Sequence, residues 1–325
     1  MLGSGVYLLE LAGEDDTFAA AEARTAASGL TVRGPGLAVA EAVDPGRAAG
    51  LAFTRRVSDA LVVAEADVEA LAERLETLPL DREGPVAVRA RDVRATAGID
   101  TQAAERRLGQ VLVDRGYEVD LASPAATLVA LFADGVGALG WATLEPDRDF
   151  SGQPTDRPFF QPGSMDPSLA RAVLNLAGVA SGDRVLDPMC GTGGLLIEAG
   201  LLGARPIGLD AQLKMVRGTR ENLRAALGGS PLVARGDGTA LPLPDGAVDA
   251  VVFDAPYGRQ SKIATHDLET LVGGALAEAR RVGSRAVVVA DRASDALARE
   301  AGWEVSARYE RRVHRSLVRH VHVLR

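Results

Sequence analysis

The chain has 325 residues, a hydrophobic fraction of 47% and a net charge of −8. This size allows two or three domains, and no apolar run approaches the roughly 20 residues of a membrane-spanning helix. The start lacks a basic segment before an apolar one, so we expect no signal peptide. The single cysteine, Cys190, excludes an intramolecular disulfide and favours a cytoplasmic location. No Cys/His cluster has metal-ligand spacing, so no metal is expected.

Charge is distributed unevenly along the chain. Residues 1–157 hold 15 Arg against 26 Asp and Glu, a net charge of −11, whereas residues 158–325 carry +3. Lysine occurs only at Lys214 and Lys262. Codon bias in a GC-rich genome and adaptation to a high-salt cytoplasm both account for such a composition. Because salt weakens long-range attraction, the total charge is a poor guide to partners.

The first half of the chain predicts an α+β module. Short strands alternate there with amphipathic helices. We expect strands at 5–11, 86–93, 119–121 and 127–132, and helices at 17–28, 66–78 and 101–115. The segment 146–163 is rich in Pro, Gly and Asp and loses periodic apolar spacing, so it predicts a domain boundary.

After this boundary, strand and helix patterns alternate. Strands are expected at 184–187, 205–210, 231–237, 247–254 and 284–290, helices at 195–203, 212–227, 268–281 and 293–301, and an antiparallel hairpin at the end. This alternation predicts an α/β fold with a mostly parallel, doubly wound sheet. Such sheets bind ligands at the carboxyl ends of their strands.

The stretch VLDPMCGTGGLLIEAG (185–200) is the strongest local motif. A buried strand ends at Asp187, a glycine-rich turn follows, and a helix begins, so the backbone can approach a ligand closely. A third glycine at position 196 would complete a dinucleotide fingerprint, but leucine stands there. No Gly-Lys-Ser/Thr follows the turn either, so a pyrophosphate ligand is disfavoured.

Four consecutive predicted strands deliver a carboxylate to the same edge. Asp187, Asp210 and Asp254 each end a strand, and Asp237 closely follows one. One such residue is readily explained as a helix cap, but four in a row favour a ligand with a ribose diol, an amine and a positive charge. S-adenosylmethionine has these features and no phosphate.

From Phe159 onward the chain resembles the Rossmann-fold methyltransferases that use S-adenosylmethionine. DPMCGTGGLLIEAG and DAPYG together resemble the RNA guanine-N2 methyltransferases, most closely the archaeal enzymes that methylate guanosine 10 of tRNA once or twice. VAVRARDV and AAERRLGQVLVDRGYEVDL are similar to a THUMP domain, an RNA-binding module. The implied organisation is a ferredoxin-like segment (1–45), a THUMP domain (46–147), a linker (148–158) and a methyltransferase domain (159–325) whose seven-stranded sheet ends in an antiparallel hairpin.

The resemblance also implies roles for single residues. Asp210 would bind the ribose hydroxyls and Asp237 the adenine amine. The segment 157–178 would close over the methionine end of the cofactor. The residues implied around that end are Gln161, Pro162, Asp187, Cys190, Gly191, Thr192 and Gly193. Cys190 lies inside this turn, which favours a packing role over that of a nucleophile.

The target base would meet the stretch from Asp254 to Tyr257. Asp254 and a backbone carbonyl near Ala255 and Pro256 would accept the two N–H bonds of the guanine amine, and Tyr257 would stack on the extruded base. The family's usual pattern is Asp-Pro-Pro-Tyr, and this chain has Ala255 at the first proline position. The methyl group would move by in-line displacement, with proximity and orientation as the main catalytic contribution.

The expected partner is tRNA, and a monomer is plausible. Arg89 and Arg91 alternate on one strand and would share a face, where they could contact phosphates or form a solvated strand surface. The arginine run near the C-terminus could form a basic edge beside the site or protect an edge strand.

Several alternatives remain open on the sequence alone. They are N2 methylation of another tRNA or ribosomal RNA guanosine, DNA adenine-N6 methylation, an RNA-binding protein with an inactive methyltransferase domain, and a nicotinamide oxidoreductase.

Overall fold

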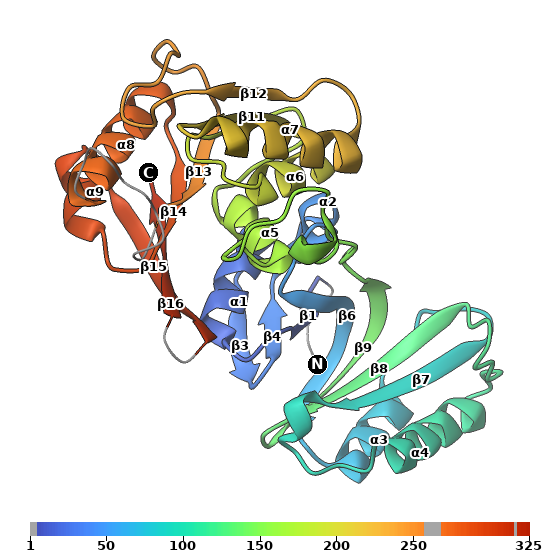
Figure 1. Ribbon diagram of the computed structural model, residues 1–325. Coiled ribbons are helices and arrows are strands. Elements are labelled where there is room, and N and C mark those ends of the chain that lie inside the picture. The colour runs from blue at the N-terminus through green and yellow to red at the C-terminus, as the bar shows by residue number, and fades with distance from the viewer. Residues whose placement is uncertain (1–4, 257–267, 315–316) are drawn as a thin grey trace. The chain divides into compact units, whose positions relative to one another are not determined.

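The computed structural model describes residues 5–256, 268–314 and 317–325. It divides into two compact units, residues 1–147 and 148–325 (Figure 1). Within the described ranges, no helix has the length and apolar character needed to cross a membrane.

The first unit is built on one mixed sheet. Its described strands follow the order β3-β4-β1-β6-β9-β8-β7. Their bounds are β1 Tyr7–Leu11, β3 Thr31–Gly34, β4 Leu37–Ala40, β6 Thr54–Glu65, β7 Val86–Asp92, β8 Ala126–Ala133 and β9 Val136–Leu144. A separate small pair joins β2 Ala27–Ser28 to β5 Ala42–Val43. The helices are α1 Asp16–Ala23, α2 Pro45–Ala48, α3 Val68–Thr77 and α4 Thr101–Asp114, with a short 3₁₀ turn, η1 Val93–Ala95.

The long strand β6 joins the two parts of this sheet, because it pairs with β1 on one side and with β9 on the other. Helices α3 and α4 lie beside each other (Figure 1). Their residues Leu71, Leu75 and Leu108 belong to one apolar cluster with residues of the strands. The sheet also curls on itself: Arg91 of β7 places its Nε 2.9 Å from Glu10 Oε1 of β1. One continuous sheet therefore runs through the ranges 1–45 and 46–147.

The second unit is an α/β fold. Its described strands follow the order β12-β11-β10-β13-β14-β16-β15. They are β10 Arg184–Asp187, β11 Arg205–Asp210, β12 Leu232–Arg235, β13 Ala250–Asp254, β14 Ala286–Ala290, β15 Val305–His314 and β16 Leu317–Leu324. The helices are α5 Pro167–Leu176, α6 Gly194–Leu201, α7 Leu213–Leu227, α8 Leu268–Val282 and α9 Asp295–Glu300, and η2 Pro154–Asp156 is a 3₁₀ turn. β10 to β14 are parallel, whereas β16 is antiparallel to both β14 and β15.

Successive residues of these strands point to opposite faces of the sheet, and both faces are buried, as expected for a doubly wound fold. Leu186, Val251 and Phe253 pack with residues of α8 and α9 in one apolar cluster. On the opposite face, Gly208 lies so close to Leu196 of α6 that an added Cβ would come within 2.6 Å of it. The predicted mostly parallel sheet with a final antiparallel hairpin is confirmed.

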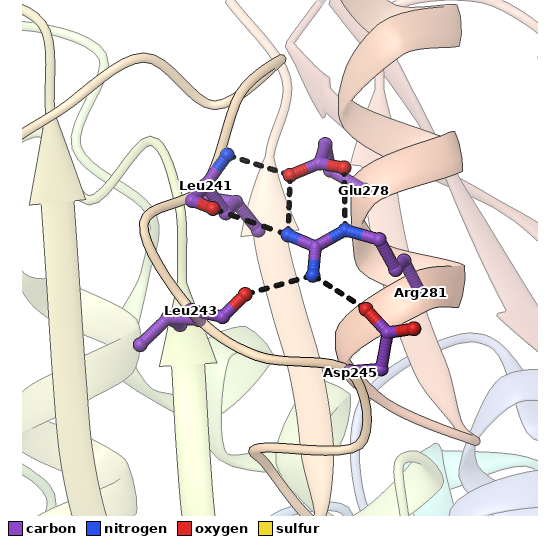
Figure 2. A network of polar contacts seen from close by, with 5 residues as sticks. All are labelled: Leu241, Leu243, Asp245, Glu278 and Arg281. Atoms are coloured by element: carbon purple, nitrogen blue, oxygen red, sulfur yellow. Dashed lines mark hydrogen bonds and ion pairs between the residues drawn. The ribbon is translucent and has the colours of Figure 1, made fainter.

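A polar network fastens the connection between β12 and β13 to α8 (Figure 2). Arg281 of α8 donates to the carbonyl oxygens of Leu241 and Leu243 and to the carboxylates of Asp245 and Glu278. Glu278 also accepts from Leu241 N at 2.6 Å. Hydrogen bonding to Arg281 lowers the pKa of Glu278. The network fixes the chain segment that leads from Asp237 to β13 and its terminal Asp254.

Some predicted elements of the first unit were wrong. The expected strand 119–121 is only an isolated bridge between Val119 and Val86, because Asp120 turns the chain by accepting hydrogen bonds from Ala122 N and Ser123 N. The strands β4, β6 and β9 were not predicted at all. Alanine or glycine hides the alternation of polar and apolar residues in β4 and β9, and the continuous apolar run ALVVA interrupts it in β6.

Candidate active site

Three of the four predicted carboxylates end neighbouring parallel strands. Asp187 ends β10, Asp210 ends β11, and Asp254 ends β13, and β10 lies between the other two. Asp237 follows β12 by two residues and is exposed. The topology therefore brings all four to the carboxyl edge of the sheet, where a parallel α/β sheet binds its ligands.

The turn after β10 is held in shape by backbone hydrogen bonds to two of these carboxylates. Asp187 Oδ1 accepts from Met189 N at 3.0 Å, and Asp210 Oδ2 accepts from Gly191 N at 3.0 Å. The other oxygen of Asp210 accepts from Gln212 N at 2.8 Å. Asp210 thus joins the ends of β10 and β11, and its remaining lone pairs stay available to a ligand.

A cavity of about 180 Å³ lies against this turn. Four parts of the second unit line it: the segment 161–165, the stretch from Asp187 into the start of α6, Met215 of α7, and Asp254. The lining includes the predicted cofactor residues Gln161, Pro162, Asp187, Cys190, Gly191 and Thr192. Gly193, Asp210, Asp237, Ala255 and Pro256 do not line it. Tyr257 lies outside the described residues, so its predicted stacking role stays a prediction.

The segment 159–165 is fastened over the turn by side chains of the turn and of α7. Asn222 of α7 accepts from Phe159 N at 2.8 Å and donates to the carbonyl oxygens of Phe159 and Thr192. The hydroxyls of Ser164 and Thr192 lie 3.1 Å apart. One amide side chain therefore sets the spacing between the two walls of the cavity.

The cavity is acidic and partly desolvated. Burial raises the pKa of Asp187 well above its usual range, and the neighbouring Asp210 and Asp254 raise it further. Burial also raises the pKa of Asp210. Buried carboxylates favour a cation and hydroxyl or amine donors, and they repel phosphate. At Gly191, with φ of +51°, an added Cβ would meet only Met189 O at 4.0 Å, so backbone is open to a ligand there. These carboxylates and this open stretch of backbone fit S-adenosylmethionine, which carries a sulfonium cation, ribose hydroxyls and amine groups.

Cys190 has the packing role that the sequence favoured. Its side chain is buried in an apolar cluster with Leu196, Val216 and Val233. Burial raises the pKa of the thiol well above its usual value, and the charges of Asp187 and Asp210 act in the same direction. A thiol held protonated is a poor nucleophile.

Asp254 differs from the other carboxylates in its partners. Its Oδ2 lies 3.2 Å from Nη2 of Arg319, a residue of β16 whose side chain is 4% exposed. Its Oδ1 is buried and has no hydrogen-bond partner among the described residues. Burial raises the pKa of Asp254 to about 7, Arg319 opposes this rise, and Asp291 adds to it.

Ala255 replaces a proline without loosening the backbone at this point. Its N–H donates to Val289 O of β14 at 2.7 Å, a hydrogen bond that a proline could not make. The Ala255 side chain is buried in the cluster beneath α8. Pairing with β14 therefore restricts the backbone at Ala255, where a proline ring would otherwise do so.

Residues 154–321 match the family described as UPF0020, the RMKL-like methyltransferase domain. The tRNA (guanine(10)-N2)-dimethyltransferase of Methanothermobacter thermautotrophicus is 36% identical over 282 residues, which cover 84% of this chain and 83% of that protein. The chain belongs to the RMKL-like methyltransferase family.

Two solved structures share the fold of this methyltransferase. TrmN from Thermus thermophilus matches 98% of this chain and 99% of its own, with 24% identity and a TM-score of 0.52. A putative methyltransferase, SMU.472, complexed with SAH, matches 99% of this chain and 98% of its own, with 15% identity and a TM-score of 0.54. The family and the site together make this chain an enzyme that uses S-adenosylmethionine.

The two arginines predicted to contact RNA are both engaged within the first unit of the methyltransferase. Arg89 donates to the carbonyl oxygens of Val88 and Leu121, each at 3.1 Å. Arg91 pairs with the buried Glu10, although its side chain remains 49% exposed. Of the two, Arg91 has more surface left for a phosphate.

Arg319 is the site residue that sequence reasoning did not single out. It was one of several similar arginines in the C-terminal run, and only its position on β16 distinguishes it. Its Nη2 also donates to Gly163 O at 3.1 Å. It therefore contacts both Asp254 and the segment that lines the cavity.

Proposed function

We propose that this enzyme transfers methyl groups from S-adenosylmethionine to the exocyclic N2 of guanosine 10 in tRNA, first once and then a second time. The observation that carries the proposal is Asp254, which ends β13 at the cavity and has a buried oxygen without a partner among the described residues. A buried acceptor without a donor is costly, and an amine N–H would satisfy it. The relative from Methanothermobacter thermautotrophicus, by its name, acts on guanine 10 at N2.

The chemistry requires little beyond positioning. S-adenosylmethionine, when bound, supplies an electrophilic methyl group on a sulfonium. The guanine N2 is a weak nucleophile because its lone pair is delocalised into the ring. Asp254, together with a backbone carbonyl near Ala255 and Pro256, accepts its N–H bonds and aims the lone pair. A nitrogen–carbon bond forms as the sulfur–carbon bond breaks, the electron pair stays on sulfur, and the proton lost by N2 passes to Asp254 during or after transfer.

The remaining acids serve the cofactor in this proposal. Asp210, which already organises the turn through Gly191, binds the ribose hydroxyls with its remaining lone pairs. Asp187 and the turn from Cys190 to Gly193 contact the methionine part. Asp237, exposed beyond β12, accepts from the adenine amine. Gln161 and Pro162 cover the methionine end.

The first unit positions the RNA. We assign residues 46–147 to a THUMP domain and residues 1–45 to a ferredoxin-like segment, with a linker at 148–158. Arg91 is the better candidate for a phosphate contact, since Arg89 is occupied by two carbonyl oxygens. We place the enzyme in the cytoplasm with tRNA as its partner, and a monomer suffices for this chemistry.

The test is transfer of labelled methyl groups to unmodified tRNA transcripts, followed by nuclease digestion and mapping. A transcript with adenosine in place of guanosine 10 is the matched control. We expect label in N2-methylguanosine at position 10, dimethylguanosine at later times, and none in the control transcript. Label at another guanosine, in tRNA or ribosomal RNA, would refute the position and retain the chemistry. Cofactor binding without label in any RNA would favour an RNA-binding protein with an inactive domain.

A further inference from the structure

Arg319 lies where the fold brings an antiparallel strand to the active edge. β16 runs against β14, and His320 pairs with Ala290, the last residue of β14. β14 is in turn the neighbour of β13, where Val289 pairs with Asp254. The residue next to His320 therefore stands at the same edge as the catalytic carboxylate, and its long side chain reaches across β14 to it.

Two described contacts place Arg319 between the carboxylate and the cavity wall. Its Nη2 lies 3.2 Å from Asp254 Oδ2 and donates to Gly163 O at 3.1 Å. The other carboxylate oxygen, Oδ1, receives no hydrogen bond from the described residues. The arginine thus engages one oxygen of Asp254 and leaves the second for another donor, while it links the carboxylate to the segment that lines the cofactor cavity.

We propose that Arg319 is a positioning residue for methyl transfer: it holds the Asp254 carboxylate in one orientation, with Oδ2 engaged and Oδ1 left to accept the N–H of the target amine. This inference rests on the proposed function, because it assigns Arg319 a part in the same step. Its hydrogen bond to Gly163 O further implies that one side chain fixes the Asp254 carboxylate relative to the segment 161–165, which lines the cavity.

The charges around Asp254 agree with this role. The charge of Asp291, which follows β14, raises the pKa of Asp254, and Asp187 at the end of β10 is a second nearby acid. Arg319, on β16, is the opposing cation and lowers that pKa. Because an arginine partner lowers a carboxyl pKa by about one to three units, its loss should raise the pKa of Asp254 by a similar amount.

The pH dependence of turnover tests the proposal in the full-length enzyme. With saturating cofactor and tRNA, kcat of the wild type should rise as the pH passes about 7, where Asp254 loses its proton. Arg319→Met should move this limb up by about one to three pH units and lower kcat at pH 7 by roughly 5- to 500-fold. Arg319→Lys, which keeps the charge, should leave the limb near its wild-type position. The matched control is Arg308→Met, on the adjacent strand, because the described ion pair of Arg308 is with Asp295 and not with Asp254.

A titration of the Asp254 side chain, followed by carboxyl carbon NMR in the free proteins, separates this inference from the proposed function. If the wild type methylates no RNA, the proposed function fails, while the titration still shows whether Arg319 controls Asp254. If Arg319→Met fails to fold, Arg319→Lys decides the question. A rise of about one to three units in both the pH limb of kcat and the Asp254 pKa of Arg319→Lys is the shift expected for loss of the cationic partner. Such a rise would overturn the role of the charge. An unchanged Asp254 pKa in a folded Arg319→Met protein, with only its melting temperature lowered, would make Arg319 a scaffold residue and overturn the proposal.

Discussion

Asp254 combines a place at the end of a central strand with a carboxyl pKa raised to about 7 by burial. Its side chain is 21% exposed, so it is shielded from water and still accessible from the cavity that it lines. Burial favours the protonated form, and Arg319 favours the ionised form. The balance leaves a carboxylate near physiological pH that can both accept a hydrogen bond and take up a proton.

Replacing Asp254 should separate chemistry from cofactor binding. We expect Asp254→Ala to lower kcat by about 10²- to 10⁴-fold, the usual contribution of a positioned acid or base. Asp254→Asn is the matched variant, because its amide oxygen can still accept a hydrogen bond but cannot take the proton. SAH binding measured by calorimetry should change little in either variant. A collapse of SAH affinity with normal turnover of the bound complex would contradict the assigned role.

The sequence located three of the acids at strand ends but could not identify their partners. Asp187, Asp210 and Asp254 each follow a buried apolar run, so their place at the strand ends could be inferred without a structure. Arg319 could not be found in this way. It meets a residue 65 positions earlier in the chain, and nothing local distinguishes it from Arg311 or Arg312.

Among the elements, the turn between β10 and α6 is constrained in two ways. Gly193 has φ of +82° and caps α6, and an added Cβ would come within 2.7 Å of Thr219 Cγ2. Thr219 is itself fixed, because its hydroxyl donates to Gly191 O at 2.6 Å. The turn is therefore restricted both by backbone conformation and by the helix α7 packed against it.

A pair of glycine substitutions should separate these two restrictions. Gly193→Ala combines the positive φ with the clash against Thr219, whereas Gly182→Ala has φ of +87° and no atom within 4 Å of the added Cβ. We expect the control to lose about 1 kcal/mol of unfolding free energy and Gly193→Ala to lose about 2–4 kcal/mol. Urea denaturation would measure both. Equal losses of unfolding free energy in the two variants would show that α7 can move away from the added methyl group without a cost in stability.

Element prediction was accurate where the chain alternates strands and helices, because short buried strands flanked by turn residues have distinct boundaries. β10 and β11 match their predicted ranges, and α8 differs from its range by one residue. In the first unit, the apolar run ALVVA within β6 does not alternate with polar residues and is too short to distinguish a strand from a buried helix segment. Its identity depends on pairing with β1 and β9, which no local pattern encodes.

At the level of the whole molecule, charge and architecture divide at nearly the same place. The acidic excess lies in residues 1–157, and the structure divides between residues 147 and 148. Each unit has its own buried core. If the first unit binds RNA, it does so through local basic surface, since its net charge opposes a polyanion.

Dividing the chain should therefore divide its binding functions. We expect the fragment 148–325 to bind SAH with the affinity of the full chain, because the described cavity lining lies entirely within it. The same fragment should bind tRNA more weakly than the full chain. Calorimetry with SAH and filter binding with tRNA over a salt titration would measure the two. Equal tRNA affinity of the fragment would contradict an RNA-binding role for the first unit.

The place of Arg319 in chain order has a consequence for biosynthesis. Asp187, Asp210 and Asp254 are all translated before β16, the strand that inserts between β14 and β15. A nascent chain on the ribosome can thus pair β10, β11 and β13 while the far side of β14 still lacks its neighbour. On the proposed role of Arg319, such a chain would bind S-adenosylmethionine before β16 pairs with β14. Arg319 would then orient the Asp254 carboxylate only after the last strand has been added.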